Sequence, residues 1–175
     1  MKNEPWLMDK YNQVCQSRIP GYALVSLKIK RFRIFNRLYD RETGDLLIEK
    51  VYEVLEDWLE DGEYIARIYL DYYNILMRFP DDYDALFARV IEMNRIVRDM
   101  PYEPFQGKIF SGLGIFPLPE EPVDFYTAQY NADICRNECP QSPYRNSHFE
   151  VYGVTYRDNN LLAFDLAQNL LPAID

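Results

Sequence analysis

The chain has 175 residues, enough for one domain with a sizeable core of its own. Its formal net charge is −9 and its pI is about 4.7, which argues against nucleic acid or an anionic membrane as the main partner, because both would repel it. No stretch approaches the roughly 20 apolar residues of a membrane span, and no signal peptide is recognisable, so a cytoplasmic protein is expected.

The pattern of apolar residues predicts alternating strands and helices. A β-prone run at 22–32 predicts a strand buried on at least one face. From Asn36 to about residue 61, apolar residues at i, i+3 and i+4 spacing predict one long amphipathic helix. Two short β-prone runs at 63–70 and 74–79 predict a hairpin around Asp71, Tyr72 and Tyr73.

The second half of the chain continues this alternation. Asp81 and Asp82 are suited to cap a helix that ends before Pro101. A strand at 108–116, a helix at 123–138 and a strand at 148–154 follow. This order predicts an α+β domain with a mostly antiparallel sheet covered by helices.

Metal-ligating side chains are few. The chain has three cysteines, Cys15, Cys135 and Cys139, and a single histidine, His148. The cysteines form no CxxC pair, and one histidine adds too few ligands for a structural zinc site. We therefore expect reduced thiols, no cofactor and no metal, and a structural role for His148.

Four partial motifs occur in a fixed order between about residues 22 and 154. They are LVSLKIKRFRIFNRLYDRETGDLLIEKVYEVL, ARIYLDYYNILMRF, FSGLGIF and NADICRNE. Together they resemble the strand, signature hairpin, Ser-Ile-Gly strand and Ala-Asp helix of GGDEF (diguanylate cyclase) domains. The residues retained are Phe32, Asn36, Gly44, Asp45, Arg67, Asp71, Gly114, Ala132 and Asp133. The resemblance implies the nucleotidyl-cyclase, ferredoxin-like palm fold with about five strands.

The resemblance also implies a two-metal reaction, because these cyclases join two GTP molecules into cyclic di-GMP with divalent ions held by carboxylates. Here Lys30 replaces the strand aspartate and Tyr72 replaces the signature glutamate. An ammonium repels a cation, and a protonated phenol is a poor ligand. We therefore expect a degenerate domain that is not an enzyme and lacks diguanylate cyclase activity.

Other positions of the family pattern are altered as well. Tyr69 and Leu70 replace the two signature glycines, so side chains fill the place where backbone would approach a phosphate. Arg37 replaces the aspartate after Asn36, which alters guanine recognition. The positions predicted to form the degenerate active site are Lys30, Arg33, Asn36, Arg37, Asp45, Tyr69, Leu70, Asp71, Tyr72 and Tyr73.

The inhibitory Arg-x-x-Asp site of the family aligns with residues 60–63. Glu60 stands in place of the arginine and Glu63 in place of the aspartate. Without the guanidinium, cyclic di-GMP has no charged donor there, so product feedback is expected to be lost.

Basic residues cluster at positions 28–37 of this acidic chain, where they form an anion-attracting patch. Lys30, Asn36 and Arg37 are the candidate nucleotide-binding residues, with GTP as the ligand. Lys30 has a second interpretation, a solvated or salt-bridged lysine at an abandoned site. The hairpin tyrosines either form a protein-binding surface or pack across the two strands.

Two functions follow from this pattern. The first is a regulatory or interaction domain of cyclic di-GMP signalling that modulates an attached or partner EAL-type phosphodiesterase or mediates homodimerisation. The alternative is a module that senses GTP without turning it over. Residues 1–156 are assigned to the GGDEF-like domain. The amphipathic tail at 157–175 resembles a connector towards an EAL domain, and a helix docked on its own domain is the alternative.

Overall fold

The computed structural model describes residues 1–79, 82–143 and 145–153. Its elements are α1 (Glu4–Gln16), β1 (Tyr22–Ile29), α2 (Phe32–Leu38), α3 (Arg41–Trp58), β2 (Tyr64–Tyr69), β3 (Tyr72–Arg78), α4 (Tyr83–Arg98), β4 (Ser111–Pro117), α5 (Phe125–Glu138) and β5 (His148–Val151). The tail assigned as a connector, 157–175, lies outside the described residues. None of the described helices is long and apolar enough to cross a bilayer.

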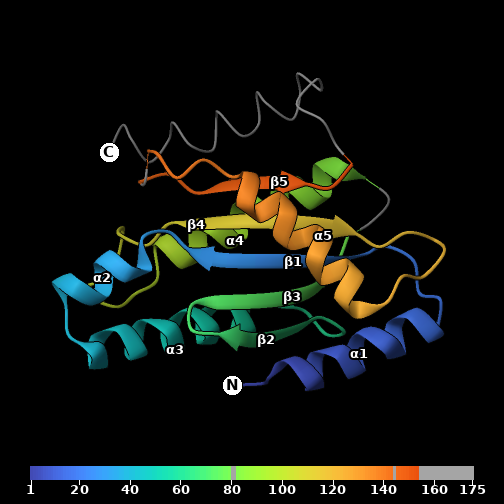
Figure 1. Ribbon diagram of the computed structural model, residues 1–175, viewed down its shortest axis with the longest axis horizontal. Coiled ribbons are helices and arrows are strands. Elements are labelled where there is room, and N and C mark those ends of the chain that lie inside the picture. Colours follow the sequence, from blue (N-terminus) through green and yellow to red (C-terminus); the bar gives the residue numbers. More distant parts are fainter. Residues whose placement is uncertain (80–81, 144, 154–175) are drawn as a thin grey trace.

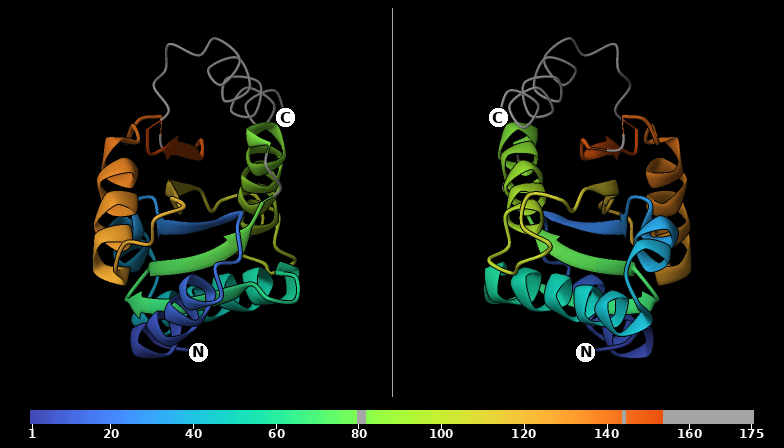
Figure 2. Two further views of the ribbon diagram at one scale, coloured as in Figure 1. Left: turned by 90° about the vertical axis from the view of Figure 1, so that its right-hand side faces the viewer. Right: turned by 90° about the vertical axis from the view of Figure 1, so that its left-hand side faces the viewer.

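The strands form one five-stranded sheet in the order β2-β3-β1-β4-β5, with β1 at its centre (Figure 1). The pairs β1–β3, β1–β4 and β2–β3 are antiparallel, and β4–β5 is parallel. Helices α3 and α4 cover one face, and α1 and α5 cover the other (Figure 2). The predicted α+β palm fold is confirmed.

The two faces of the sheet differ in polarity along β1. Towards α3 and α4 the strand presents only buried apolar residues, Ala23, Val25, Leu27 and Ile29. On the other face the row is Tyr22, Leu24, Ser26 and Lys28, in which Ser26 is fully buried and Lys28 is exposed. The end of β1 on the α5 face is therefore polar.

The helix predicted from Asn36 to about residue 61 is two helices. Helix α2 begins earlier, at Phe32, and the chain is extended at Tyr39 and Asp40. The Asp40 carboxylate accepts from the backbone N–H of Thr43 at 2.7 Å and thereby caps α3. The apolar periodicity continues through this point, but the cap favours a break because it supplies the acceptor that a helix start needs.

Candidate functional site

A cavity of about 600 Å³ opens where the end of β1, the β1–α2 turn, the β2–β3 tip and the end of α5 meet. Five cationic side chains line it: Lys28, Lys30, Arg31, Arg33 and Arg136. Asp71 is the one carboxylate among the described residues of the lining. The cavity is therefore basic on a chain whose net charge is −9, and it attracts anions.

Most of the predicted degenerate active-site positions line this cavity, namely Lys30, Arg33, Asn36, Tyr69, Leu70, Asp71 and Tyr72. Three do not. Arg37 is exposed in the last turn of α2, and Asp45 is exposed on α3. Tyr73 points to the opposite face, where it is fully buried and its hydroxyl donates to the carbonyl of Ile48 at 2.7 Å.

The Asn36 carboxamide packs against α3 at Gly44, where there is room for it because glycine has no side chain. A Cβ at Gly44 would lie 2.0 Å from Oδ1 of Asn36, closer than any real contact. Glycine at this position therefore lets the carboxamide lie against α3 at the rim of the cavity. The structure thus gives Gly44 a packing role beside Asn36.

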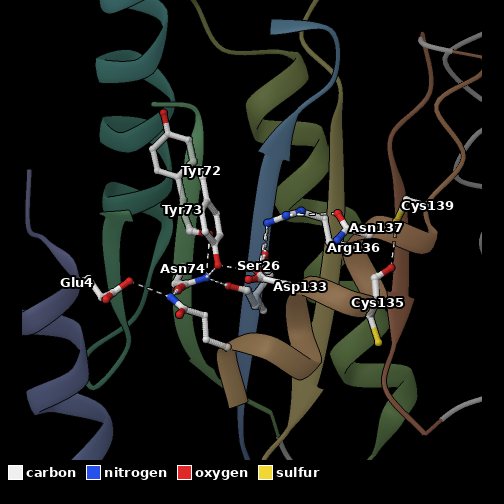
Figure 3. Close-up of polar contacts among 12 residues, drawn as sticks. Glu4, Ser26, Tyr72, Tyr73, Asn74, Asp133, Cys135, Arg136, Asn137 and Cys139 are labelled. Atoms are coloured by element: carbon white, nitrogen blue, oxygen red, sulfur yellow. Dashed lines mark hydrogen bonds and ion pairs between the residues drawn. The ribbon is translucent and has the colours of Figure 1, made fainter. Parts of the chain in front are cut away.

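Tyr72 donates its hydroxyl hydrogen to Oδ1 of Asp133 on α5 at 2.6 Å (Figure 3). The same carboxylate oxygen accepts from Ser26 Oγ at 2.6 Å and from Arg136 Nη1 at 3.2 Å. The Arg136 guanidinium also lies 4.7 Å from the centre of the Tyr72 ring, a cation–π distance. Burial, together with Asp133, raises the pKa of Tyr72, so the phenol stays protonated.

The polar side chains around this cavity do not suit the pair of divalent metal ions that the reaction of GGDEF cyclases requires. Oxygen-rich sites need several carboxylates or carbonyls, and no group of three potential His, Cys, Asp or Glu ligands occurs among the residues that the structure describes. Tyr72 is committed to Asp133, and Lys28 and Lys30 bring positive charge to the strand. The described residues of this cavity therefore do not form a site for such a metal pair.

Asp71 is buried, with 6% of its surface exposed. Burial raises the pKa of its carboxyl, and the nearby Lys28 and Arg136 act in the opposite direction. Asp71 thus lies beside cations that partly offset the cost of its burial.

Lys30 places its ammonium against Nδ1 of His148 on β5. Burial, together with the charge of Lys30, lowers the pKa of His148 to about 4. His148 is therefore neutral near pH 7 and accepts from Lys30. This contact joins the turn after β1, the central strand, to β5 at the edge of the sheet.

We expect the His148 contact to weaken in acid. The pKa of His148 is lower in the folded chain than its ordinary value of 6.5, so the unfolded chain binds the proton first. The stability that this neutral histidine contributes is complete above about pH 6.5 and falls as the pH drops towards about 4. Urea unfolding at a series of pH values should show a steeper loss for the wild type than for His148→Gln. Equal slopes would contradict the prediction.

Leu70 at the hairpin tip occupies the left-handed region, with φ of 49°. A leucine there costs roughly 1–2 kcal/mol, and the conformation is one that glycine adopts freely. The side chain is 45% exposed, and that of its neighbour Tyr69 is 70% exposed. The tight turn thus persists without the glycine that would suit it.

Leu70→Gly is expected to raise the free energy of unfolding by about 1 kcal/mol, because it relieves this strain although glycine gains freedom in the unfolded chain. Urea denaturation measures the change. Leu70→Ala is the matched control, since it removes the leucine side chain but keeps the Cβ that causes the strain. A glycine variant no more stable than the alanine variant would refute the explanation.

The two positions predicted as a degenerate inhibitory site have different environments. Glu60 is exposed, whereas the Glu63 side chain is fully buried and forms a two-point ion pair with Arg89 of α4. Backbone N–H groups of Arg78 and Glu60 donate to the same carboxylate at 2.7 and 2.9 Å. Burial acts to raise the pKa of Glu63, but Arg89 and these amides outweigh it, and the pKa lies below its usual value. Glu63 is an internal structural residue.

No protein-family model and no curated protein matches this chain. Solved structures do. The GGDEF domain of DgcB from Caulobacter crescentus, in complex with c-di-GMP, matches with a TM-score of 0.71 and 15% identity, over 87% of this chain and 89% of that one. The active GGEEF domain of a diguanylate cyclase from Vibrio cholerae matches with a TM-score of 0.72 and 13% identity, over 88% of this chain and 99% of that one. The chain has a GGDEF-like fold. The GGDEF domain of PA1120 from Pseudomonas aeruginosa also matches this fold, with a TM-score of 0.70 and 14% identity, over 93% and 95%.

This likeness overturns one prediction. The chain was expected not to be an enzyme because its metal carboxylates are replaced. The GGDEF-like fold, however, is shared with an active diguanylate cyclase domain, so the replaced positions alone do not support a claim of no activity. That prediction is wrong as stated.

Arg136 and Asp133 are the site residues whose roles the sequence did not reveal. Both lie in the NADICRNE segment, but the resemblance assigned neither of them to the cavity. A charged pair three residues apart on a helix that packs over a sheet was the available signal, because such residues share one helix face. Whether that helix face points towards the cavity depends on how α5 docks on the sheet.

Proposed function

We propose that this chain is a regulatory domain of cyclic di-GMP signalling that binds a guanine nucleotide through its phosphates in the basic cavity. The observation that carries the proposal is the convergence of five cationic side chains on one cavity of about 600 Å³. That volume is in the range of small-molecule and cofactor sites. Guanidinium and ammonium groups form charge-assisted hydrogen bonds with phosphate oxygens without a metal.

The arrangement around the cations also supports this ligand class. Asn36 lines the cavity, and its carboxamide carries the donor and acceptor groups that a base edge can pair with. Among the solved structures that share the fold, DgcB holds c-di-GMP. Phosphate binding by Lys28, Lys30 and Arg136, with the base towards Asn36, uses the groups that the cavity presents.

Calorimetric titration of GTP with magnesium and with a chelator tests this function. We expect binding in both conditions, because the cations come from the protein. Arg33→Glu should weaken the affinity about tenfold or more, whereas Arg18→Glu, the same charge reversal at an exposed residue outside the cavity, should leave it nearly unchanged. The same samples are assayed for cyclic di-GMP. No heat with GTP, GDP or cyclic di-GMP would refute nucleotide binding.

The exposed hairpin tip favours a second function, contact with an EAL-type phosphodiesterase. Tyr69 and Leu70 are 70% and 45% exposed, and aromatic side chains at such positions are frequent anchors of interfaces. The hydrolysis of cyclic di-GMP by an EAL-type phosphodiesterase is measured with and without this domain. The wild type should change the rate, and Tyr69→Ser should reduce that change. A rate that is the same with and without the domain would refute this function.

A further inference from the structure

A second cavity, of about 290 Å³, adjoins the basic cavity at α2. It is bounded by the β1–α2 turn, the C-terminal end of α2 and residues 108–110, which precede β4. Figure 1 shows α2 at the end of the sheet where β1 ends and β4 begins. Lys30, Arg31 and Ile34 line both cavities, so the turn forms a shared wall. This second cavity is here called the α2 cavity.

Much of the lining of the α2 cavity is apolar. Ile29 and Ile109 line it and are buried, at 5% and 3% exposure. The Phe35 ring lies beside them and stacks on Tyr39, with 4.5 Å between the ring centres. Leu38 also lines the cavity and is 75% exposed, more than any other large apolar residue that the structure describes. A ligand with an apolar body would therefore remove apolar surface from water here.

The remaining lining of the α2 cavity is cationic. Lys30, Arg31, Lys108 and Arg145 line it, and no Asp or Glu is found among the lining residues within the described ranges. His148, which Lys30 contacts, is neutral near pH 7, so that contact does not cancel the charge of the ammonium. The α2 cavity therefore attracts an anion locally, although the chain as a whole is acidic.

The walls of the α2 cavity are fixed by the fold. The backbone N–H of Lys30 donates to the carbonyl of Phe110 at 2.8 Å, which ties the β1–α2 turn to the segment before β4. At the end of α2, the backbone N–H of Tyr39 donates to the carbonyl of Phe35 at 2.9 Å. The Phe35 ring also packs against Phe105, with 5.7 Å between the ring centres. A preformed cavity of this kind binds a ligand without the cost of ordering its walls.

We propose that the α2 cavity binds a small organic anion with an apolar body, of the class of medium-chain carboxylates. The anionic group lies among the four cations, and the apolar body lies against Ile29, Phe35 and Ile109. An inorganic anion would leave the apolar wall unused, and a neutral apolar molecule would leave the cations without an acceptor. The volume is about half of the 600 Å³ of the basic cavity, which suits a ligand smaller than a nucleotide. This site does not depend on nucleotide binding.

Calorimetric titration of the whole chain with three probes tests the ligand class. Octanoate carries both features, 1-octanol lacks the charge and acetate lacks the apolar body. We expect octanoate to bind one saturable site, and 1-octanol and acetate each to bind at least about tenfold more weakly. Failure of octanoate to bind would overturn the proposal, as would an equal affinity for octanoate and either of the other probes.

Two variants locate the octanoate site. Lys108→Glu and Leu38→Ser should each weaken octanoate binding at least about fivefold, because both residues line the α2 cavity and neither lines the basic cavity. Arg18→Glu and Leu46→Ser, at exposed residues that line neither of these cavities, are the matched controls and should leave the affinity nearly unchanged. Circular dichroism checks that all four variants are folded. An affinity that either Lys108→Glu or Leu38→Ser leaves unchanged would overturn the assignment, whatever the result with GTP.

Discussion

Arg89→Met is expected to lower the free energy of unfolding by about 3 kcal/mol, because it leaves the Glu63 carboxylate buried without its cation. The Glu63 side chain has no exposed surface, and Arg89 Nη2 donates to its Oε1 at 2.7 Å. Arg89 also lies 4.7 Å from the Trp58 ring, so its loss removes a cation–π contact as well. Equilibrium unfolding in urea, followed by circular dichroism, measures the difference.

Arg95→Met is the matched control for this experiment. Arg95 forms an ion pair with Glu92 on the same helix, but both side chains are largely exposed, at 51% and 41%. Exposed pairs of this kind contribute about 0–1 kcal/mol. Adding Glu63→Gln to Arg89→Met should restore part of the loss, since a neutral amide costs less to bury than a lone carboxylate. A similar loss of unfolding free energy for Arg89→Met and Arg95→Met would show that the Glu63–Arg89 pair contributes no more than an exposed ion pair.

Gly114→Ala is expected to destabilise the chain by about 3 kcal/mol and to shift α5. A Cβ at this position would lie 1.9 Å from the carbonyl oxygen of Ala132 and 2.4 Å from the backbone nitrogen of Arg136. Both are backbone atoms of α5, so no side-chain rotation relieves the clash. Because α5 carries Asp133 and Arg136, the variant should also weaken nucleotide binding in the basic cavity.

Gly112→Ala, two residues earlier on the same strand, is the control for this substitution. Its added Cβ would lie 3.7 Å from the Cβ of Cys139, an ordinary contact. We expect this change to alter stability by less than about 1 kcal/mol. Thermal and urea unfolding of the two variants separates close packing at Gly114 from a general effect of alanine in β4. Equal effects of the two variants would contradict the packing argument.

The order and type of most elements followed from apolar periodicity, because strands and helices that cover one sheet each bury one face. The break at Tyr39 and Asp40 was missed, since a single capping carboxylate competes with a periodic pattern that runs through it. The hairpin was predicted despite its lack of glycine. The hairpin turn places Leu70 in the left-handed region, and the sequence did not reveal this backbone strain.

The candidate site was predictable only where its residues are close in sequence. Lys30, Arg33 and Asn36 lie in one short segment that turns from β1 into α2, and the structure keeps them in one cavity. Arg136 reaches the same cavity from a helix far along the chain, through a docking geometry that depends on Gly114. Arg89, the partner of Glu63, lies 26 residues away on α4, and family comparison alone gave that glutamate a different role.

The two faces of the sheet are packed differently, and this difference predicts which helices separate from the sheet first. Over the middle of the sheet, α5 is held by a small apolar cluster and by two hydrogen bonds, Ser26 to Asp133 and Gln129 to Asn74, whereas the opposite face is joined to α3 and α4 by a larger apolar cluster. Water replaces polar contacts at little net cost but does not replace apolar burial. In native-state hydrogen exchange, the amides of α5 therefore lose protection before those of α3 and α4. The domain loosens on the side that carries its basic cavity while its apolar half stays closed.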